Sequence, residues 1–438
     1  MVGETSANSA NDGFLKMGQE TLDGTDVIFG PLVTNIPANI FYNFTLANRA
    51  KLKSVYISDS VTTIGLQAFY YCQTVTDITI GTGVTSIGNL AFGNCTMLES
   101  FNYNAINVTS GFGSTTNNPF VYAGTGGPGF DLVFGPSVTH IPSFLFNTGG
   151  ISVKVISVSI PNGVTNIGSQ SFMYLSTLPT IDIPNSVTSI GGGAFYNCTG
   201  LITATLGTGI TTIGTELFNG CTKLTNVTIK GNIISVGNSA FLNCGALEEI
   251  IFAGTVETIG ANSFQNCASL ETITIPNSVT TMGTSVFQSC TALATATIGT
   301  GITVIPANTF QSCTALGTVN LLGAVTEIGN MSFYGCSSLT NLPILSTVET
   351  IGYGAFADCT AVTTLTLPAT LTTIGSQAFM NMSAVTVLNY NATDVTSAFP
   401  VDANDPFRGL GTGSTGVAVT FGASVLTIPV NIFYNNTV

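Results

Sequence analysis

The sequence predicts an α/β repeat solenoid, a β-rich fold in which short coils of chain stack on one another. Hydrophobic residues make up 45% of the chain and charged residues 7%, so a large apolar core is covered by uncharged polar residues. From Gly168 to Gly375 the sequence repeats every 23 residues without a break. A fixed period of this size is typical of a solenoid, whose units bury their apolar faces against their neighbours. The repeat is marked by a phenylalanine four residues after an Ile/Val/Met-Gly or Ile-Pro pair, at Phe41, Phe69, Phe92, Phe146, Phe172, Phe195, Phe218, Phe241, Phe264, Phe287, Phe310, Phe333, Phe356, Phe379 and Phe433.

The strand of each coil is indicated by alternation. In one repeat, Ile273 and Ile275 alternate with Thr272 and Thr274, which is the period of a strand with one buried face. The Pro-Asn pair at 276–277 then ends the strand as a turn. We expect these strands to be parallel and to line one face of the solenoid.

The second part of each coil predicts a short helix. Gly260 begins a segment in which Phe264 and Cys267 are three residues apart and would share one helix face. The glycine is expected to let the backbone turn into the helix, and proline replaces it where the first helical position needs no donor. The sequence therefore predicts 23-residue coils with strands on one face and short helices on the other.

The ten cysteines keep the same register. Each stands seven residues after the Gly or Pro, at Cys72, Cys95, Cys198, Cys221, Cys244, Cys267, Cys290, Cys313, Cys336 and Cys359. With no CxxC pair and a single histidine, a column of small buried thiols explains them better than metal binding or catalysis. Disulfides between coils remain open, and so does the redox compartment.

Interruptions of the period divide one elongated domain, residues 1–438. We assign 1–46 to a partial insert-type coil, 47–100 to regular coils, 101–148 to an insert coil, 149–387 to regular 23-residue coils, and 388–438 to a second insert coil with an open end. The two inserts match each other, since Asn-Tyr-Asn-Ala occurs at 102–105 and 389–392, and Pro-Phe at 119–120 and 406–407.

The two ends of the chain fall at a similar phase of this larger repeat, with no evident polar cap. This pattern leaves two explanations open: a fragment of a longer protein, or ends that meet head to tail in a polymer. The residues expected at such ends are Phe14, Phe29, Phe41, Phe421 and Phe433.

The repeat unit resembles the BspA-like leucine-rich repeat (LRR) family. Residues 183–201 and 275–293 carry the pattern Ile-Pro-Asn-Ser-Val-Thr-x-Ile/Met-Gly-x-x-x-Phe-x-x-Cys-x-x-Leu almost whole, and the resemblance extends over about residues 30–435. It implies a right-handed solenoid with a strand-lined face. It also implies a surface protein of bacteria or mucosal protists that acts as an adhesin and has no enzymatic activity.

A polar column is expected where strand residues face solvent. Side chains two apart share a strand face, so equivalent positions in stacked coils form a regular array. We interpret this array as a protein-binding or glycan-binding face, with ice binding as a minor alternative and a plain solvated sheet as the simplest one. Its members are Thr203, Thr205, Asn226, Thr228, Thr272, Thr274, Thr295, Thr297, Thr364 and Thr366.

The sequence gives little indication of a catalytic site or a metal site. His140, the only histidine, lies where other coils have Ser, Thr or Asn, and is interpreted as a surface substitution. Glu248 and Glu271 hold equivalent positions in adjacent coils near Glu249 and Glu257; carboxylates bind Ca²⁺, but without a calcium-loop motif we interpret them as solvated acids. We predict no enzyme activity, no cofactor and no metal.

Composition limits the partners and the location. The net charge of −13 argues against nucleic acid as a partner, because binding to its phosphates needs clustered Lys and Arg. No apolar run is long enough for a membrane span, and the N-terminus shows no signal peptide. We therefore expect an extracellular or cell-surface protein, seen as a mature form or fragment. Its expected partner is a surface or matrix protein, bound by the strand face or the insert loops. The alternative is self-association into an extracellular filament or sheath.

Overall fold

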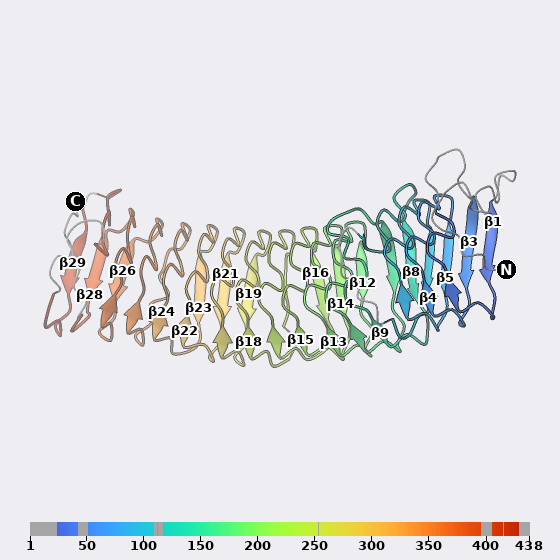
Figure 1. The fold of residues 1–438 in the computed structure, drawn as a ribbon. Coiled ribbons are helices and arrows are strands. Elements are labelled where there is room, and N and C mark those ends of the chain that lie inside the picture. Colours follow the sequence, from blue (N-terminus) through green and yellow to red (C-terminus); the bar gives the residue numbers. More distant parts are fainter. Residues whose placement is uncertain are drawn as a thin grey trace. The chain divides into compact units, whose positions relative to one another are not determined.

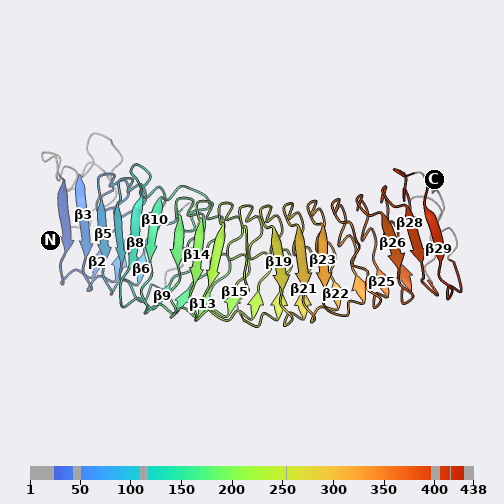
Figure 2. The ribbon, with the colours of Figure 1, turned by 180° about the vertical axis from the view of Figure 1, so that it is seen from behind.

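The fold consists of stacked coils whose strands form parallel ladders. The computed structural model describes residues 24–42, 51–108, 112, 117–252, 254–395, 405–414 and 416–428. These belong to two compact units, residues 1–210 with 217–231 (unit 1) and residues 211–216 with 232–438 (unit 2). Most coils contribute a longer strand to a first row and a two-residue strand to a second row, and within each unit the strands of a row lie side by side (Figures 1 and 2).

Unit 1 has two sheets in each row. The first row comprises β1 (Thr25–Phe29), β3 (Leu52–Ile57), β5 (Asp77–Ile80), β7 (Ser100–Tyr103), β8 (Phe130–Phe134) and β10 (Val155–Ser159), followed by the separate sheet of β12 (Thr180–Asp182), β14 (Thr203–Leu206) and β16 (Asn226–Ile229). The second row comprises β2 (Asn35–Ile36), β4 (Thr63–Ile64) and β6 (Ser86–Ile87), then β9 (His140–Ile141), β11 (Asn166–Ile167) and β13 (Ser189–Ile190).

Unit 2 repeats this arrangement. Its first row comprises β19 (Thr272–Ile275), β21 (Thr295–Ile298) and β23 (Thr318–Leu321), then β26 (Thr364–Leu367), β28 (Val387–Tyr390) and β29 (Ala418–Phe421). Its second row comprises β15 (Thr212–Ile213), β17 (Ser235–Val236), β18 (Thr258–Ile259) and β20 (Thr281–Met282), then β22 (Val304–Ile305), β24 (Glu327–Ile328), β25 (Thr350–Ile351) and β27 (Thr373–Ile374).

The predicted short helices are wrong: the described residues contain no α-helix. In the segment after Gly260, the amides of Asn262, Phe264 and Asn266 donate to carbonyls of the next coil, at 2.9–3.0 Å. Asn262 (φ 56°) and Asn266 (φ 61°) adopt left-handed backbone conformations, which end a right-handed helix. The segment is therefore a series of turns whose amides bond the next coil instead of the residue four positions back.

Gly260 and Gly283 are needed for close approach and not for turning the chain. A Cβ added to Gly283 would lie 2.3 Å from the amide nitrogen of Ala261 in the preceding coil, and one at Gly260 would lie 2.5 Å from that of Asn238. No side chain fits at such distances. These two Ile-Gly and Met-Gly pairs thus mark places where the backbones of adjacent coils come very close.

The core contains a column of stacked phenylalanines. In unit 2 the rings of Phe264, Phe287, Phe310 and Phe333 follow one another with centroids 5.3–5.5 Å apart and nearly parallel planes. Each ring is fully buried. Aromatic pairs contribute beyond their buried area, so the column joins consecutive coils independently of the strand ladders.

The two rows are interrupted at different coils within each unit. In unit 1 the first row breaks between β10 and β12. Pro179 stands there at the repeat position that Glu99 and Ala294 hold in other coils. The amides of Glu99 and Ala294 bond the preceding coil, and proline has no amide hydrogen to do so. In unit 2 the second row breaks between β20 and β22, where Pro306 replaces the glycine whose amide bonds the preceding coil. Where one row is broken, the other row is paired across the same two coils: β11 with β13, and β19 with β21.

Candidate functional site

The predicted polar column lies on the outward face of the first row. All ten of its residues are exposed or half-exposed, and the residues between them are mostly buried. In unit 1, Thr203 lies opposite Asn226 and Thr205 opposite Thr228. In unit 2, Thr272 and Thr274 lie opposite Thr295 and Thr297. The expected register is therefore present, and Thr364 and Thr366 hold the same positions on β26.

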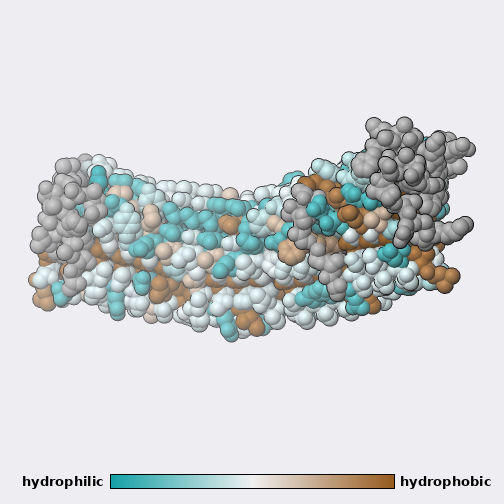
Figure 3. Space-filling model, in the orientation of Figure 1, coloured by the Kyte–Doolittle hydropathy of each residue, from teal (hydrophilic) through white to brown (hydrophobic). Residues whose placement is uncertain are grey.

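Hydrogen bonds between coils order this face. The side-chain amide of Asn320 donates to the Thr297 hydroxyl at 3.3 Å, and that of Asn389 donates to Thr366 at 3.1 Å. In unit 1, Asn102 donates to Thr79 at 3.2 Å. These bonds hold uncharged donors and acceptors in a fixed spacing, and white and teal residues make up most of the surface seen in Figure 3.

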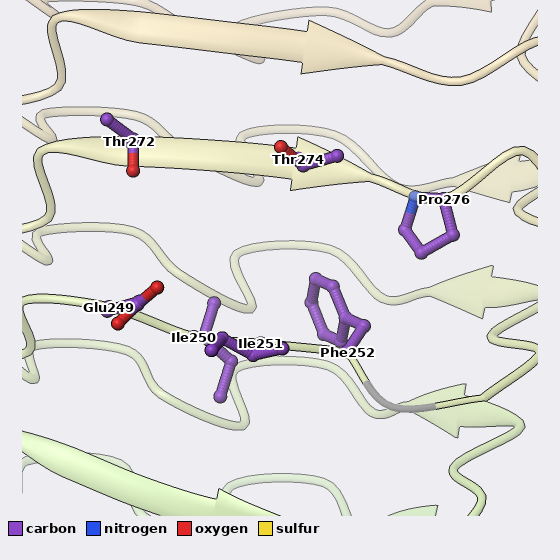
Figure 4. Close-up of a pocket in the computed structure, with 7 residues that line it drawn as sticks. All are labelled: Glu249, Ile250, Ile251, Phe252, Thr272, Thr274 and Pro276. Atoms are coloured by element: carbon purple, nitrogen blue, oxygen red, sulfur yellow. The ribbon is translucent and has the colours of Figure 1, made fainter.

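One coil departs from the column and forms a groove. Glu249 and Ile251 take the outward positions that Thr272 and Thr274 hold in the next coil, and residues 248–252 form no strand. A groove of about 330 Å³ lies there, lined by Glu249, Ile250, Ile251, Phe252, Thr272, Thr274 and Pro276 (Figure 4). The prediction of the site omitted Glu249 and Ile251; the signal that marks them is a Glu–Ile pair next to coils that carry Thr272 and Thr274 and then Thr295 and Thr297. Other strands of the first row also depart from Thr and Asn, as Asp131 and Val133 do.

The groove has an acidic and apolar lining. Ile251 is 67% exposed. Phe252 is half-exposed, whereas Ile275, which holds the position of Phe252 in the next coil, is buried. Glu248, Glu249, Glu257 and Glu271 are all exposed. Among the described residues the structure has one ion pair, Lys230–Asp182, in unit 1. The described residues also contain no group of three or more His, Cys, Asp or Glu side chains arranged for a metal ion.

The cysteine column is confirmed as buried and unbridged. All ten cysteines are buried and none of them forms a disulfide. The Cys267 thiol donates to the Phe241 carbonyl at 3.3 Å, and Cys313 donates to Phe287 at 3.0 Å. Burial raises the pKa of Cys290 and Cys359 from 9.0 to about 12. Such thiols stay protonated near neutral pH, which makes them structural groups and poor nucleophiles.

The inserts contribute core phenylalanines that the repeat pattern missed. Phe120 stacks on Phe92 with a centroid distance of 5.7 Å, and Phe407 stacks on Phe379 at 5.3 Å. Neither follows an Ile-Gly or Ile-Pro pair, but both follow proline in the matched inserts. Parts of both insert loops, residues 109–111, 113–116 and 396–404, lie outside the described residues.

The residues predicted for assembly ends divide into three groups. Phe14 and Phe433 lie outside the described residues. Phe41 is buried, with 3% exposed, and Phe29 stacks edge-on against it at 6.5 Å. Phe421 is 43% exposed on β29. His140 is exposed in β9, opposite Asn166, as expected for a surface substitution.

A membrane-spanning helix is absent from the part of the chain that the structure describes.

Comparisons with known proteins concern the repeat and the fold. The family profile described as BspA type leucine rich repeat region, in six copies, matches residues 34–115, 139–271 and 257–386. A search of curated protein sequences gives no match. A leucine-rich repeat protein from Bacteroides ovatus is 24% identical over 90% of this chain and 91% of its own, with a TM-score of 0.58, which shows the shared fold.

Two other solved structures are similar over shorter stretches. A leucine rich cell surface protein from Faecalibacterium prausnitzii is 24% identical over 68% of this chain and 88% of its own, with a TM-score of 0.36. The pneumococcal vaccine antigen PcpA is 16% identical over 76% of this chain and 84% of its own, with a TM-score of 0.37.

Proposed function

We propose, from the premise that this chain belongs to the BspA-type leucine-rich repeat family, that it is a non-enzymatic cell-surface scaffold that binds other proteins. Binding would use the outward face of the first row, including the groove at Glu249. Adhesion to a surface or matrix protein is the form of this function that the family favours.

The observation that carries the proposal is the ordered polar face. Its threonine and asparagine side chains are exposed, uncharged, and held in register by parallel ladders. A partner therefore meets donors and acceptors whose positions are already fixed, which lowers the entropic cost of binding. Chemistry is disfavoured, because the thiols repeated along the stack are buried and protonated.

Binding to a panel of purified matrix and surface proteins, measured by surface plasmon resonance, tests the proposal. The variant Thr295→Lys places a long charged side chain on the outward face and should abolish any specific interaction. Its matched control is Thr281→Lys, at an exposed position of the second row in β20. Equal losses in both variants, or no loss in either, would argue against the strand face as the binding surface. Thermal hysteresis or glycan-array binding sensitive to Thr295→Lys would instead support the ice or glycan alternatives.

End-to-end assembly is the second candidate, favoured by apolar side chains near the edge strands. Ile28 on β1 is 72% exposed, and Leu426, beyond β29, is 81% exposed. A terminal strand with unpaired backbone groups is a template for another chain. In electron micrographs of the purified protein, filaments that Leu426→Lys removes would support assembly. Separate particles at all concentrations would reject it.

A further inference from the structure

The break in the first row beside Glu248–Phe252 differs from the other breaks of that row. Proline accompanies the break at β12 and the strandless segment 341–345, which contains Pro343. Residues 248–252 contain no proline, and no insert lies there. This opening therefore has a cause in its side chains.

Charged side chains disfavour pairing of the two backbones here. Glu248 lies at the register position of Glu271, and like charges opposite each other in a ladder are destabilising. Phe252 takes the place that Ile275 has in the next coil, and its ring packs edge-on against Phe264 at 6.0 Å. A ring at this position does not by itself prevent pairing, since Tyr103 lies opposite Phe134 in the paired strands β7 and β8. The charge repulsion is therefore the feature that disfavours the close approach of a ladder.

The opening leaves backbone groups without partners. In regular coils the amide at the Glu271 position bonds the preceding coil; Ala294, for example, donates to the Glu271 carbonyl at 2.8 Å. Within the described structure no backbone hydrogen bond joins residues 248–252 to residues 271–275. Such groups bond either water or a ligand, and extended peptides take them readily.

The lining selects the side chain of the ligand. Glu249 supplies a carboxylate at one end of the groove, and Ile251, Phe252 and Pro276 supply apolar surface that extends towards the other end (Figure 4). Arginine matches this combination, because its planar guanidinium binds a carboxylate through two hydrogen bonds and its methylenes and planar face pack on apolar and aromatic groups. The acidic surroundings and the net charge of −13 favour a cationic ligand in the same sense.

We propose that this groove binds an arginine on an extended segment of a partner protein, an inference that rests on the proposed binding function. The guanidinium pairs with the Glu249 carboxylate, the arginine methylenes pack on Ile251 and Phe252, and the segment's backbone bonds the free amide of Glu271. The partner would thereby add hydrogen bonds where the first row is open.

Titration of peptides into the intact chain tests this. The probe is a blocked, fluorescently labelled peptide, Thr-Val-Arg-Val-Thr, compared with versions carrying glutamate or norleucine in place of arginine. Fluorescence anisotropy should show saturable binding of the arginine peptide only. Glu249→Gln and Ile251→Thr, which restores the threonine column, should each weaken binding about tenfold, equivalent to about 1.4 kcal/mol. Glu327→Gln, which removes an exposed carboxylate from β24, should leave binding unchanged.

Hydrogen–deuterium exchange supplies a second readout. The arginine peptide should slow exchange of residues 270–276 and leave residues 316–321 unaffected. Equal binding of the glutamate or norleucine peptide, or no effect of Glu249→Gln, overturns the inference.

Failure of this proposal and failure of the proposed function give different results. If the arginine peptide does not bind but Thr295→Lys still abolishes capture of a purified partner, the groove proposal is wrong and the strand-face function stands. If Thr295→Lys has no effect as well, both are wrong.

Discussion

The two strand rows of each unit differ in where they are interrupted. In unit 2 the first row is open beside Glu248–Phe252, yet the second row pairs β18 with β20 across the same two coils. The second row is open between β20 and β22, and there the first row pairs β19 with β21. Each of these coil pairs therefore keeps one ladder, and the phenylalanine column runs past both breaks.

The alternation shows that the stacking of two coils does not require both ladders. A coil is kept in place by one ladder, by the turn amides and by its phenylalanine, so the other ladder can be given up locally. Loss of a ladder frees backbone groups and opens a groove on an otherwise regular face. Buried columns, ladders and the outward face should therefore contribute differently to stability, and variants in each of them can measure this.

Alkaline pH should have the largest effect, because it acts on many buried thiols at once. The pKa of Cys290 and Cys359 is raised by burial to about 12, above the 9.0 of an unfolded thiol. The stability they contribute is fully present below about pH 9 and is lost as pH rises towards about 12, at about 1.4 kcal/mol per pH unit for each thiol. Urea unfolding followed by circular dichroism across this range measures the slope. The double variant Cys290→Ala/Cys359→Ala should lose less stability per pH unit, by the contribution of two thiols. An unchanged pH slope would contradict a role of these buried thiols in alkaline unfolding.

Breaking the phenylalanine column should cost more than any change on the outward face. Phe310 is fully buried between Phe287 at 5.5 Å and Phe333 at 5.3 Å. Phe310→Ala should lower the free energy of unfolding by about 3–5 kcal/mol through lost burial and a cavity. The control Thr297→Ala, on the half-exposed face, should stay within about 0.5 kcal/mol. Similar losses from both variants would mean that the column does not dominate stacking.

Loss of a ladder should cost more where the other row is already open. The Gly283 amide donates to the Ile259 carbonyl at 2.8 Å beside the open first row, and the Gly329 amide makes the equivalent bond to Ile305 at 2.8 Å where β21 and β23 are paired. Proline occurs naturally at this position, as Pro306 shows. Each proline also brings ring atoms to a place where the coil backbones leave no room for a side chain, so both variants should be destabilising. We expect Gly283→Pro to cost about 2 kcal/mol more than Gly329→Pro, because only Gly283→Pro also leaves no ladder. Equal costs in chemical denaturation would mean that the alternation has no energetic role.

Relieving the charge repulsion at the groove should have the smallest effect. Glu248→Thr removes one of two carboxylates at equivalent positions and should stabilise unit 2 by about 0.5 kcal/mol at low salt, less at high salt. Exchange of the Glu271 amide should slow as the ladder closes. Glu327→Thr is the matched control, because Glu327 lies opposite Val304 and Thr350 and faces no like charge. Stabilisation by the control alone would refute the electrostatic cause of the opening.

The sequence predicts the periodic features of the fold well and the local departures poorly. Alternation of Thr and Ile at 272–275 predicted the strand and its outward residues, and the fixed spacing of Phe264 and Cys267 predicted their shared burial. The same spacing suggested a helix, because residues three apart can share a helix face. It could not show that the amides of Asn262 and Asn266 bond the next coil, since that depends on how coils stack.

The groove and the extra core rings escaped prediction for a related reason. Phe120 and Phe407 stand outside the Ile-Gly register, and only the stacked structure shows that they continue the column. Glu249 and Ile251 occupy ordinary positions of their coil, so their significance appears only against neighbours that carry threonine. A repeat pattern describes what coils share, whereas a binding site depends on where one coil differs.

The sequence separation of the contacts has a consequence for the order in which the chain folds. Hydrogen bonds between coils join residues mostly 22 to 31 positions apart, as in Cys267 to Phe241 at 26 and Asn320 to Thr297 at 23. Loops of this length close at a similar, modest entropic cost wherever they occur. Folding can therefore begin at any adjacent pair of coils and spread in both directions, one coil at a time, without waiting for distant segments.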